Sequence, residues 1–495
     1  MQRLNKNKSL LILFALLILG FFYRIYGLLA NYSFWNDEEN VATFARVILQ
    51  RGYPVLGNGY STGVYNWLQY WLSAGSAKIF GLNEFAVRFP SVIFGVLTVW
   101  VVYLLGKELF NKKVGLISAF FVTFLKIEIL WSRQARPYQS LQLFYLLGAF
   151  FLYKFIQNKF NLKYFWGFLA CCFLASLMHG LGLCLFLVGL FYILFNLKGH
   201  FNKRKLTWLF LILIGLITIA YFLKDNIFLK IRGFGTYNNF FYYRVFLTHN
   251  YLWISLSAFL GFIWLGLKRE YRKLLIFLLP LGLQTIIVSF SLFQPFIRYF
   301  YIVFPFVILL SAFFLYSLSE CFKNKIISNL FLIFLVFLLV FASKNKLALL
   351  PQKTYSLNED MQEIPEVDYK KIYGFIEKKL NDNPEAVFIS NWFDHPIWYL
   401  GEGGLDYWLR AKDFPNQTKD AFSGAIFIDS LNSLKEIISK EKKGIIILES
   451  WESQLPEGVR EYIRLNLKKE FEWDRLYPVQ PRYWPVEVYS WGIDK

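Results

Sequence analysis

Apolar runs of about 20 residues recur along the first two thirds of this 495-residue chain, and they constrain its fold more than any other feature. A helix needs about 20 apolar residues to cross the hydrocarbon core of a bilayer. The chain is 56% hydrophobic and only 18% charged, whereas soluble proteins carry about 25% charged residues. A soluble globular enzyme is excluded, and the pattern predicts a polytopic α-helical membrane protein.

The apolar runs predict eleven transmembrane helices. They are expected at 9–30, 87–106, 114–131, 140–157, 164–178, 181–197, 206–223, 250–267, 273–292, 298–318 and 326–342. The first run is long for a signal peptide and no clear cleavage site follows it, so we expect it to be retained. The short pair 164–178 and 181–197 could instead form one broken hairpin, which would reverse the orientation of everything after it.

Charge divides the chain near residue 345. Residues 1–343 contain 32 Lys and Arg against 9 Asp and Glu, whereas residues 344–495 contain 21 against 25. With eleven spans and a cytoplasmic N-terminus, nineteen cations lie on the cytoplasmic side, as the positive-inside rule requires. The charge bias thus argues against the merged hairpin, explains the basicity without nucleic-acid binding, and predicts a multi-pass protein of the cell (inner) membrane.

The odd number of spans places the first outer loop, 31–86, and the C-terminal segment on the outer face. We therefore expect a transmembrane domain at 1–345 and a soluble extracytoplasmic domain at 346–495. Short apolar runs and one amphipathic stretch in the second domain are typical of an α/β fold. The expected strands are 386–390, 425–429 and 444–448, and the expected helical stretch is 431–444.

Acidic residues are rare in the membrane part, so each can be weighed separately. Asp37, Glu38 and Glu39 directly follow the first span, and Glu128 lies near the outer end of the third. A charged side chain at mid-membrane costs roughly 2.5–3.5 kcal/mol, so such residues tend to mark sites. Alternatively, the acidic string is an interfacial helix start, in which Asn36 or Asp37 is the N-cap and the other acids favour the helix dipole.

Arg133 and Arg136 form a second cluster at the outer end of the third span, where the charge bias does not place cations. Their spacing puts both on one face of a helical turn. A guanidinium fork matches a phosphate, so an anionic lipid headgroup is the predicted ligand, with ordinary phospholipid anchoring as the alternative. Arg298 with Tyr299, and His179, are further outer-end candidates, although a lone histidine is more often structural.

Several motifs follow one another in unbroken order along residues 1–345. They include WNDEENVATFARVILQRGYPV, IFGLNEFAVRFPSVIFGVLTVWVVYLLGKELF, SRQARPYQSL and FIRYFYIVFP. In this order they resemble the dolichyl-phosphate-mannose protein mannosyltransferase superfamily, including its bacterial lipid-linked-sugar transferases. The resemblance implies the C-type glycosyltransferase fold and transfer of a sugar, on the outer face, from a polyprenyl-phosphate donor to an acceptor hydroxyl.

The resemblance also implies roles for individual residues. Asp37 would be the catalytic base, with Glu38 as its catalytic neighbour. The donor phosphate would be bound by Arg133, Arg136 and Arg298, and the residues that could line the site are Tyr138, His179, Tyr299 and Glu128. Some relatives carry another acid in the second outer loop, where this chain has Pro137 and Tyr138. Without a second clear carboxylate, a single inverting displacement is expected.

The sequence shows no Cys/His cluster with metal spacing and no Gly-rich nucleotide loop, so we expect no metal and no cofactor. The expected partners are the bilayer, a polyprenyl-phosphate sugar, and a glycan, lipid or protein acceptor. The competing class is a transporter or flippase for an anionic lipid, although the paired broken helices typical of transporters are not evident. A catalytically inactive relative that acts as an assembly partner is a third possibility.

Overall fold

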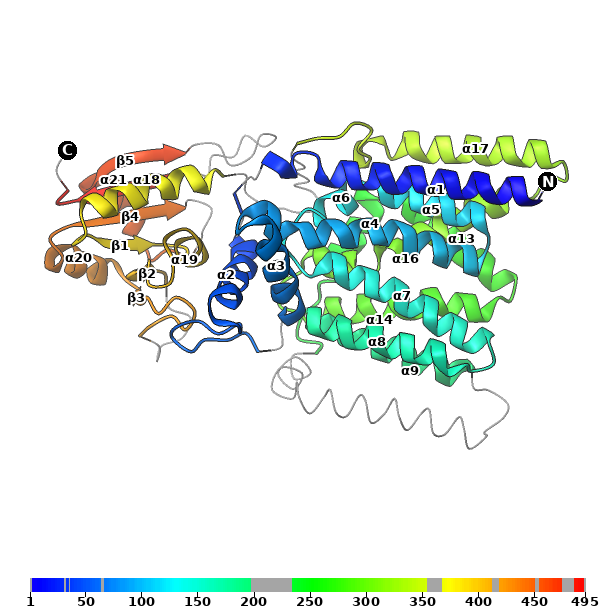
Figure 1. Cartoon of the computed structure of the whole chain (residues 1–495), viewed down its shortest axis with the longest axis horizontal. Coiled ribbons are helices and arrows are strands. Elements are labelled where there is room, and N and C mark those ends of the chain that lie inside the picture. The colour runs from blue at the N-terminus through cyan, green and yellow to red at the C-terminus, as the bar shows by residue number, and fades with distance from the viewer. Residues whose placement is uncertain are drawn as a thin grey trace. The chain divides into compact units, whose positions relative to one another are not determined.

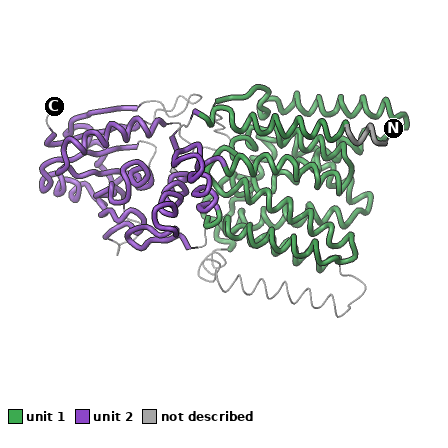
Figure 2. The backbone as a smooth tube through the Cα atoms, in the orientation of Figure 1, with its two compact units in different colours: residues 1–29, 64–68, 90–362 green, residues 30–63, 69–89, 363–495 purple. Residues whose placement is uncertain are grey.

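The computed structural model describes residues 2–30, 33–34, 36–63, 66–196, 234–353, 367–411, 418–449, 454–473 and 485–493. The chain forms two compact units (Figure 2). Unit 1 comprises 1–29, 64–68 and 90–362, and unit 2 comprises 30–63, 69–89 and 363–495. Most of the predicted first outer loop, 31–86, therefore groups with the C-terminal domain, whereas the sequence predicted it as part of the transmembrane domain.

Unit 1 consists of helices, the longest of which run side by side (Figure 1). The α-helices are α1 (Gln2–Ile25), α4 (Glu84–Leu109, whose residues up to Phe89 belong to unit 2), α5 (Lys112–Phe124), α6 (Lys126–Trp131), α7 (Tyr138–Gln157), α8 (Leu162–Met178), α9 (Cys184–Asn196), α12 (Phe240–Val245), α13 (Leu252–Leu267), α14 (Tyr271–Phe290), α15 (Ile297–Tyr301), α16 (Phe304–Ser319) and α17 (Lys325–Ala342). Short helical turns are η1 (Leu28–Ala30), η2 (Gly180–Leu183), η3 (Phe246–Asn250) and η4 (Lys344–Lys346).

The helices have the apolar lengths of a multi-pass membrane protein. Among the described residues, five helical segments are long and apolar enough to cross a bilayer, or six if the bent pair Phe240–Asn250 and Leu252–Leu267 is one span. The five are Lys8–Ala30, Glu84–Leu109, Tyr138–Gln157, Tyr271–Phe290 and Lys325–Ala342. The predicted span 206–223 lies outside the described residues, so the number eleven stays a prediction.

Two predicted spans are interrupted. The segment 114–131 breaks into α5 and α6 at Leu125, and 298–318 breaks into α15 and α16. The uncertain pair 164–178 and 181–197 forms separate helices, α8 and α9, joined by His179 and η2. The shortness of several helices therefore has a local cause, which is a break in the backbone ladder.

The break after α5 is stabilised by donors from distant parts of unit 1. Arg24 is fully buried and its Nη2 donates to the carbonyl oxygen of Val122 at 2.9 Å. The N–H of Ala348 donates to the carbonyl oxygen of Phe124 at 2.7 Å. Because unsatisfied backbone groups are costly in a membrane, these donors allow the helix to end there.

Unit 2 combines the first outer loop with a small α/β domain. From this loop, unit 2 contains α2 (Asn36–Arg51) and all of α3 (Trp67–Phe80) except its first two residues. The domain contains β1 (Val387–Ser390), β2 (Tyr407–Leu409), β3 (Ile426–Ile428), β4 (Gly444–Glu449), β5 (Lys468–Trp473), β6 (Val486–Trp491), α18 (Tyr369–Asp382), α19 (Asp394–Leu400), α20 (Leu431–Lys440) and α21 (Val459–Asn466).

The six strands form one mixed sheet in the order β3-β2-β1-β4-β6-β5. Strands β1 to β4 pair in parallel, and β6 is antiparallel to both β4 and β5. Side chains alternate between the faces of a strand, so Ile445 and Ile447 of β4 pack in the core with α18, while Ile446 and Leu448 pack in the core with α20 and α21. A central strand covered on both faces explains the continuous apolar run 444–448.

The expected α/β character of the C-terminal domain is confirmed. The predicted strands 386–390, 425–429 and 444–448 correspond to β1, β3 and β4, and the helical stretch 431–444 corresponds to α20. Strands β2, β5 and β6 were not predicted from the sequence. These strands are short or carry charged residues, as in Lys468–Trp473, so their apolar signal is weak.

Candidate functional site

The three acids after the first span occupy the first turn of α2. The predicted helix start is therefore confirmed, but the predicted N-cap is wrong, because Asn36 is already the first residue of the helix. A place in the first turn does not exclude a chemical role. Consecutive helical residues are about 100° apart, so the three carboxylates point in different directions. Asp37 is partly exposed, whereas Glu38 is 1% exposed and Glu39 is fully buried. One carboxylate of the string is accessible and two are not.

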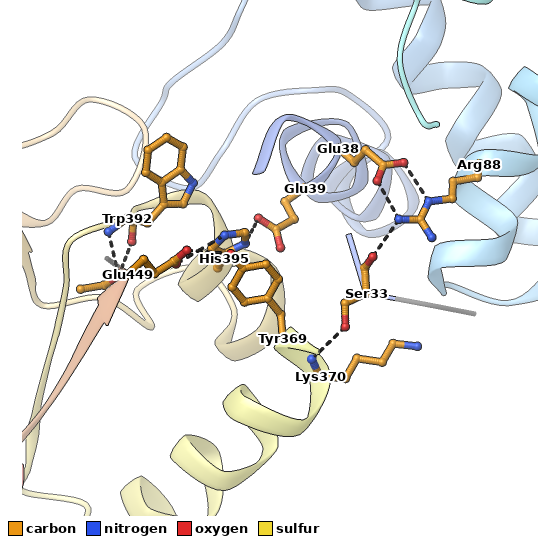
Figure 3. Close-up of polar contacts among 10 residues, drawn as sticks. Ser33, Glu38, Glu39, Arg88, Tyr369, Lys370, Trp392, His395 and Glu449 are labelled. Atoms are coloured by element: carbon orange, nitrogen blue, oxygen red, sulfur yellow. Dashed lines mark hydrogen bonds and ion pairs between the residues drawn. The ribbon is translucent and has the colours of Figure 1, made fainter. Parts of the chain in front are cut away.

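Glu38 forms a buried, bidentate ion pair with Arg88 of α4 (Figure 3). Arg88 donates from Nε to Oε1 at 2.8 Å and from Nη2 to Oε2 at 2.6 Å. The same Nη2 donates to the backbone carbonyl of Ser33 at 2.9 Å, just before α2. The guanidinium lies 4.9 Å from the ring centroid of Phe34. Arg88 therefore fixes the start of α2 to the start of α4.

Glu39 points to a different set of partners (Figure 3). Its carboxylate contacts Nδ1 of His395, and Nε2 of His395 lies 3.5 Å from a carboxylate oxygen of Glu449. Tyr369 stacks on the imidazole at 3.8 Å and donates its hydroxyl to the other oxygen of Glu449 at 2.6 Å. Glu39, His395 and Glu449 are all fully buried. We call these three residues the Glu–His–Glu cluster.

Burial sets the protonation of the Glu–His–Glu cluster. Burial, followed by the nearby carboxylates of Asp394 and Glu449, raises the pKa of Glu39 well above its ordinary value. Burial lowers the pKa of His395 well below its ordinary value. Both shifts favour the neutral forms, a protonated Glu39 in contact with an uncharged imidazole.

Unit 1 brings five of the predicted residues together in an arginine–aromatic cluster. Its members are Arg136, Tyr138, His179, Arg298 and Tyr299. The guanidiniums of Arg136 and Arg298 lie 5.5 and 5.8 Å from the ring centroid of Tyr138. The rings of Tyr138, His179 and Tyr299 are 5.6 to 6.1 Å apart. Both arginines are buried.

The positions of these residues follow from the helix ends that carry them. Tyr138 is the first residue of α7, His179 is the C-cap of α8, and Arg298 belongs to the short helix α15. The imidazole Nδ1 of His179 accepts from the N–H of Leu181 at 3.1 Å, which fixes the ring at the turn. The cluster is therefore built from residues at or near the ends of helices.

Two other predicted residues have different surroundings. Arg133 donates to the backbone carbonyls of Gln352 at 3.2 Å and Lys353 at 2.6 Å, in the segment after α17. Glu128 is fully buried and accepts from the hydroxyl of Tyr301 at 2.9 Å and from Gln142 at 3.3 Å. These contacts describe a backbone-holding arginine and a carboxylate within a hydrogen-bonded core.

The sequence analysis did not identify Arg88, His395 or Glu449. Arg88 lies within a quoted motif, but its partner Glu38 is 50 residues away. No local spacing connects Glu39 to His395. Among the described residues, no group of three or more His, Cys, Asp and Glu is arranged to hold a metal ion, and the expectation that no metal is required stays a prediction.

Part of the chain is similar in sequence to known proteins. Residues 67–223 match the family model "Dolichyl-phosphate-mannose-protein mannosyltransferase". An "Uncharacterized protein" of Aquifex aeolicus (strain VF5) is 30% identical over 183 residues, which are 35% of this chain. The matched stretch spans only 34% of that relative's length.

Solved structures match almost the whole chain. ArnT from Cupriavidus metallidurans bound to undecaprenyl phosphate is 13% identical, with a TM-score of 0.60 over 97% of both chains. The oligosaccharyltransferase AglB from Archaeoglobus fulgidus, in complex with an inhibitory peptide and a dolichol-phosphate, is also 13% identical, with a TM-score of 0.57 over 89% of this chain and 69% of AglB. The chain has the C-type glycosyltransferase fold. The resemblance noted in the sequence is confirmed.

Within this C-type fold, Arg88 should be a main determinant of unit 2 stability. Removing one partner of a buried ion pair typically costs roughly 3–5 kcal/mol because the other charge stays buried and unpaired. Arg88→Met should therefore lower the unfolding temperature of the purified protein strongly. Combining it with Glu38→Gln should cost less than the sum of the two single changes.

The control is Arg51→Met. Arg51 also pairs with a glutamate, Glu402, at 3.2 Å, but this pair is partly exposed and is expected to contribute about 0–1 kcal/mol. Thermal unfolding in detergent compares the variants. Equal losses for Arg88→Met and Arg51→Met would contradict the assigned role.

Proposed function

We propose that this protein is a membrane glycosyltransferase that moves a sugar from a polyprenyl-phosphate donor to an acceptor hydroxyl. The observation that carries the proposal is the arginine–aromatic cluster, in which two buried guanidiniums lie near one tyrosine ring. The fold supports it, because two solved structures of this fold are named as complexes with undecaprenyl phosphate and with a dolichol-phosphate. The donor phosphate is the expected ligand of the cluster.

The cluster has the chemistry of an anion site. Both guanidiniums lie near the Tyr138 ring, at 5.5 and 5.8 Å from its centroid, so an anion at this ring would be attracted by two positive charges. The guanidinium forks of Arg136 and Arg298 suit phosphate oxygens, and the aromatic rings exclude water that would weaken the contacts. Arg133, which holds backbone carbonyls, contributes by fixing its segment rather than by binding the donor.

Asp37 is the proposed general base. The leaving group is already a phosphate, so the remaining tasks are to deprotonate the acceptor and to hold the substrates in line. Asp37 is the partly exposed acid of its string, whereas Glu38 is occupied by Arg88. We therefore assign proton abstraction to Asp37 and orientation of the helix turn to Glu38. With one such carboxylate, transfer inverts the anomeric centre.

A transporter or flippase is the second candidate function. A buried pair of arginines would serve equally to bind a lipid phosphate without breaking a bond. The two functions differ in one product, which is the glycosylated acceptor. Incubating the purified protein with radiolabelled polyprenyl-phosphate sugars and following label into lipid, glycan and protein fractions decides between them.

Asp37→Asn should abolish most of the turnover while the protein remains folded. The amide keeps the size of the side chain but cannot take the proton, so transfer should fall by roughly 10²–10⁴-fold, the usual contribution of a general base. Asp382→Asn, at the exposed end of α18, is the matched control and should be neutral. Transfer rates and unfolding temperatures are compared for both. Full activity in Asp37→Asn would eliminate the base assignment.

Arg136→Ala should weaken donor binding by roughly 1.5–3 kcal/mol, the range for a hydrogen bond to a charged group. Arg136→Lys should recover part of the loss, because an ammonium keeps the charge but not the fork. Arg244→Ala, an exposed arginine in the same unit, is the control. Binding of a polyprenyl phosphate by the three variants is the measurement. If Arg136→Ala binds as tightly as Arg244→Ala, the cluster is not the phosphate site.

We also propose that the protein lies in the cell (inner) membrane with its N-terminus in the cytoplasm and its C-terminal domain outside. Cys321 is exposed and lies in a loop assigned to the cytoplasm. In intact cells, an impermeant thiol reagent should label Lys440→Cys, an exposed position in α20, but not Cys321. In permeabilised cells, the reagent should label both cysteines. Labelling of Cys321 alone in intact cells would show that the orientation is the reverse of the one proposed.

A further inference from the structure

We propose that His395 is a positioning residue, which joins Glu39 of α2 to Glu449 of the C-terminal sheet and so fixes the helical turn that carries Asp37. The inference rests on the proposed role of Asp37. It assigns a function to the Glu–His–Glu cluster, a fully buried group of ionisable side chains that the transfer chemistry does not otherwise use. The C-terminal domain then acts as the support of the proposed base.

Contacts between α2 and α19 connect the acidic string to the C-terminal domain. Glu39 and Arg46 are seven residues apart, two turns of helix, and so lie on the same face of α2. Glu39 meets His395 in the first turn of α19. Arg46 donates to the carbonyls of Ile397 at 2.6 Å and Trp398 at 2.8 Å, towards the other end of α19. One face of α2 thus contacts α19 at His395 and again at Ile397 and Trp398.

The second step is the anchoring of the histidine in the sheet. Glu449 is the last residue of β4, the strand between β1 and β6. Its N–H donates to Asn391 Oδ1 at 2.8 Å, and Asn391 Nδ2 donates back to its carbonyl at 3.0 Å. Tyr369 then fixes the Glu449 carboxylate and stacks on His395. The imidazole is therefore held on a rigid element.

The third step concerns Asp37 itself. Glu38 and Glu39 are neighbours on α2 and are bound to different elements, Arg88 of α4 and His395 of α19. Two anchors about 100° apart around one helix prevent the turn from rotating. Asp37 directly precedes these two residues in the same helical turn. The direction of its side chain is therefore determined by the same two contacts. Small misplacements of a reacting group can reduce turnover by about 10²-fold.

The cluster also predicts how stability responds to pH. Charged and ionisable groups that interact with Glu39 or its partners come from several elements. They are Glu38, Glu84, Arg88, Tyr369, Tyr373, Asp394, His395, Tyr399 and Glu449. Because the pKa of Glu39 is raised from 4.5 in the folded protein, its contribution to stability is complete below about pH 4.5 and is lost as the pH rises.

His395 contributes with the opposite sign. Its pKa is lowered from 6.5 in the folded protein, so its contribution is complete above about pH 6.5 and is lost as the pH falls towards the lowered value. The two residues therefore limit stability from opposite sides. Variants at the two positions should change the pH profile in opposite directions.

The experiment compares Glu39→Gln with Glu39→Leu in the full-length protein, with the exposed Glu436→Gln as control. Glutamine resembles protonated glutamate and can donate to Nδ1 of His395, whereas leucine has a similar size and no donor. We expect Glu39→Gln to keep the transfer rate within about threefold of the parent. Glu39→Leu and His395→Leu should reduce kcat about 10- to 100-fold with little change in donor KM, because positioning is lost and donor binding is not.

A second measurement needs no substrate. The unfolding temperature of Glu39→Gln should rise relative to the parent as the pH increases above 4.5, because only the parent loses its buried proton. A constant difference across pH 4.5–8 would overturn the protonated cluster, even if Glu39→Leu does not fold. Equal turnover for folded Glu39→Leu and Glu39→Gln would overturn the positioning role.

The outcomes separate this inference from the proposed function. If Asp37→Asn keeps its activity while the pH signature of Glu39 is present, the base assignment fails and the cluster stands as a structural element. If Asp37→Asn is inactive while Glu39→Leu is fully active, the base assignment stands and the positioning role fails.

Discussion

The buried ion pair between Glu38 and Arg88 is the interaction on which the position of the proposed base, and of the turn of α2 that carries it, depends. It ties the start of α2 to the start of α4, a helix of membrane-spanning length, and Arg88 also binds the carbonyl of Ser33. A buried pair of this kind contributes little net stability compared with apolar packing, but its geometry is specific. The pair mainly orients the first turn of α2, because Asp37, the residue directly before Glu38, is the accessible acid.

The need to satisfy backbone polar groups inside a membrane explains how the helices of unit 1 can end where they do. Helices cross lipid because they satisfy their own polar groups, and any break must be compensated by other donors. Arg24 and the N–H of Ala348 do so at the end of α5. Arg136 and Tyr138 lie where α7 begins, and Arg298 lies in the short helix α15 before the break that precedes α16. The arginine–aromatic cluster is therefore built at helix ends.

Periodicity and charge predicted what depends on local sequence. The helical character of the described spans, three strands of the C-terminal domain and α20 could all be read from apolar runs. The family resemblance grouped Arg136, Arg298, Tyr138, His179 and Tyr299 in one site with Arg133 and Glu128, and the structure brings the first five together. The partners of Glu38 and Glu39 could not be predicted from the sequence, because these contacts join residues that are 50 and more than 350 positions apart. Nor does the apolar pattern reveal that the outer loop groups with the C-terminal domain.

The order of side chains in the acidic string follows from these constraints. In a helix, three consecutive residues face three directions, so each can meet a different demand. The two glutamates have the longer side chains and reach partners on α4 and α19, while the shorter aspartate keeps its carboxylate close to the turn and partly exposed. Exchanging Asp and Glu within the string would preserve its charge and alter its reach. Charge alone therefore does not define this site, since the reach of each carboxylate determines which partner it meets.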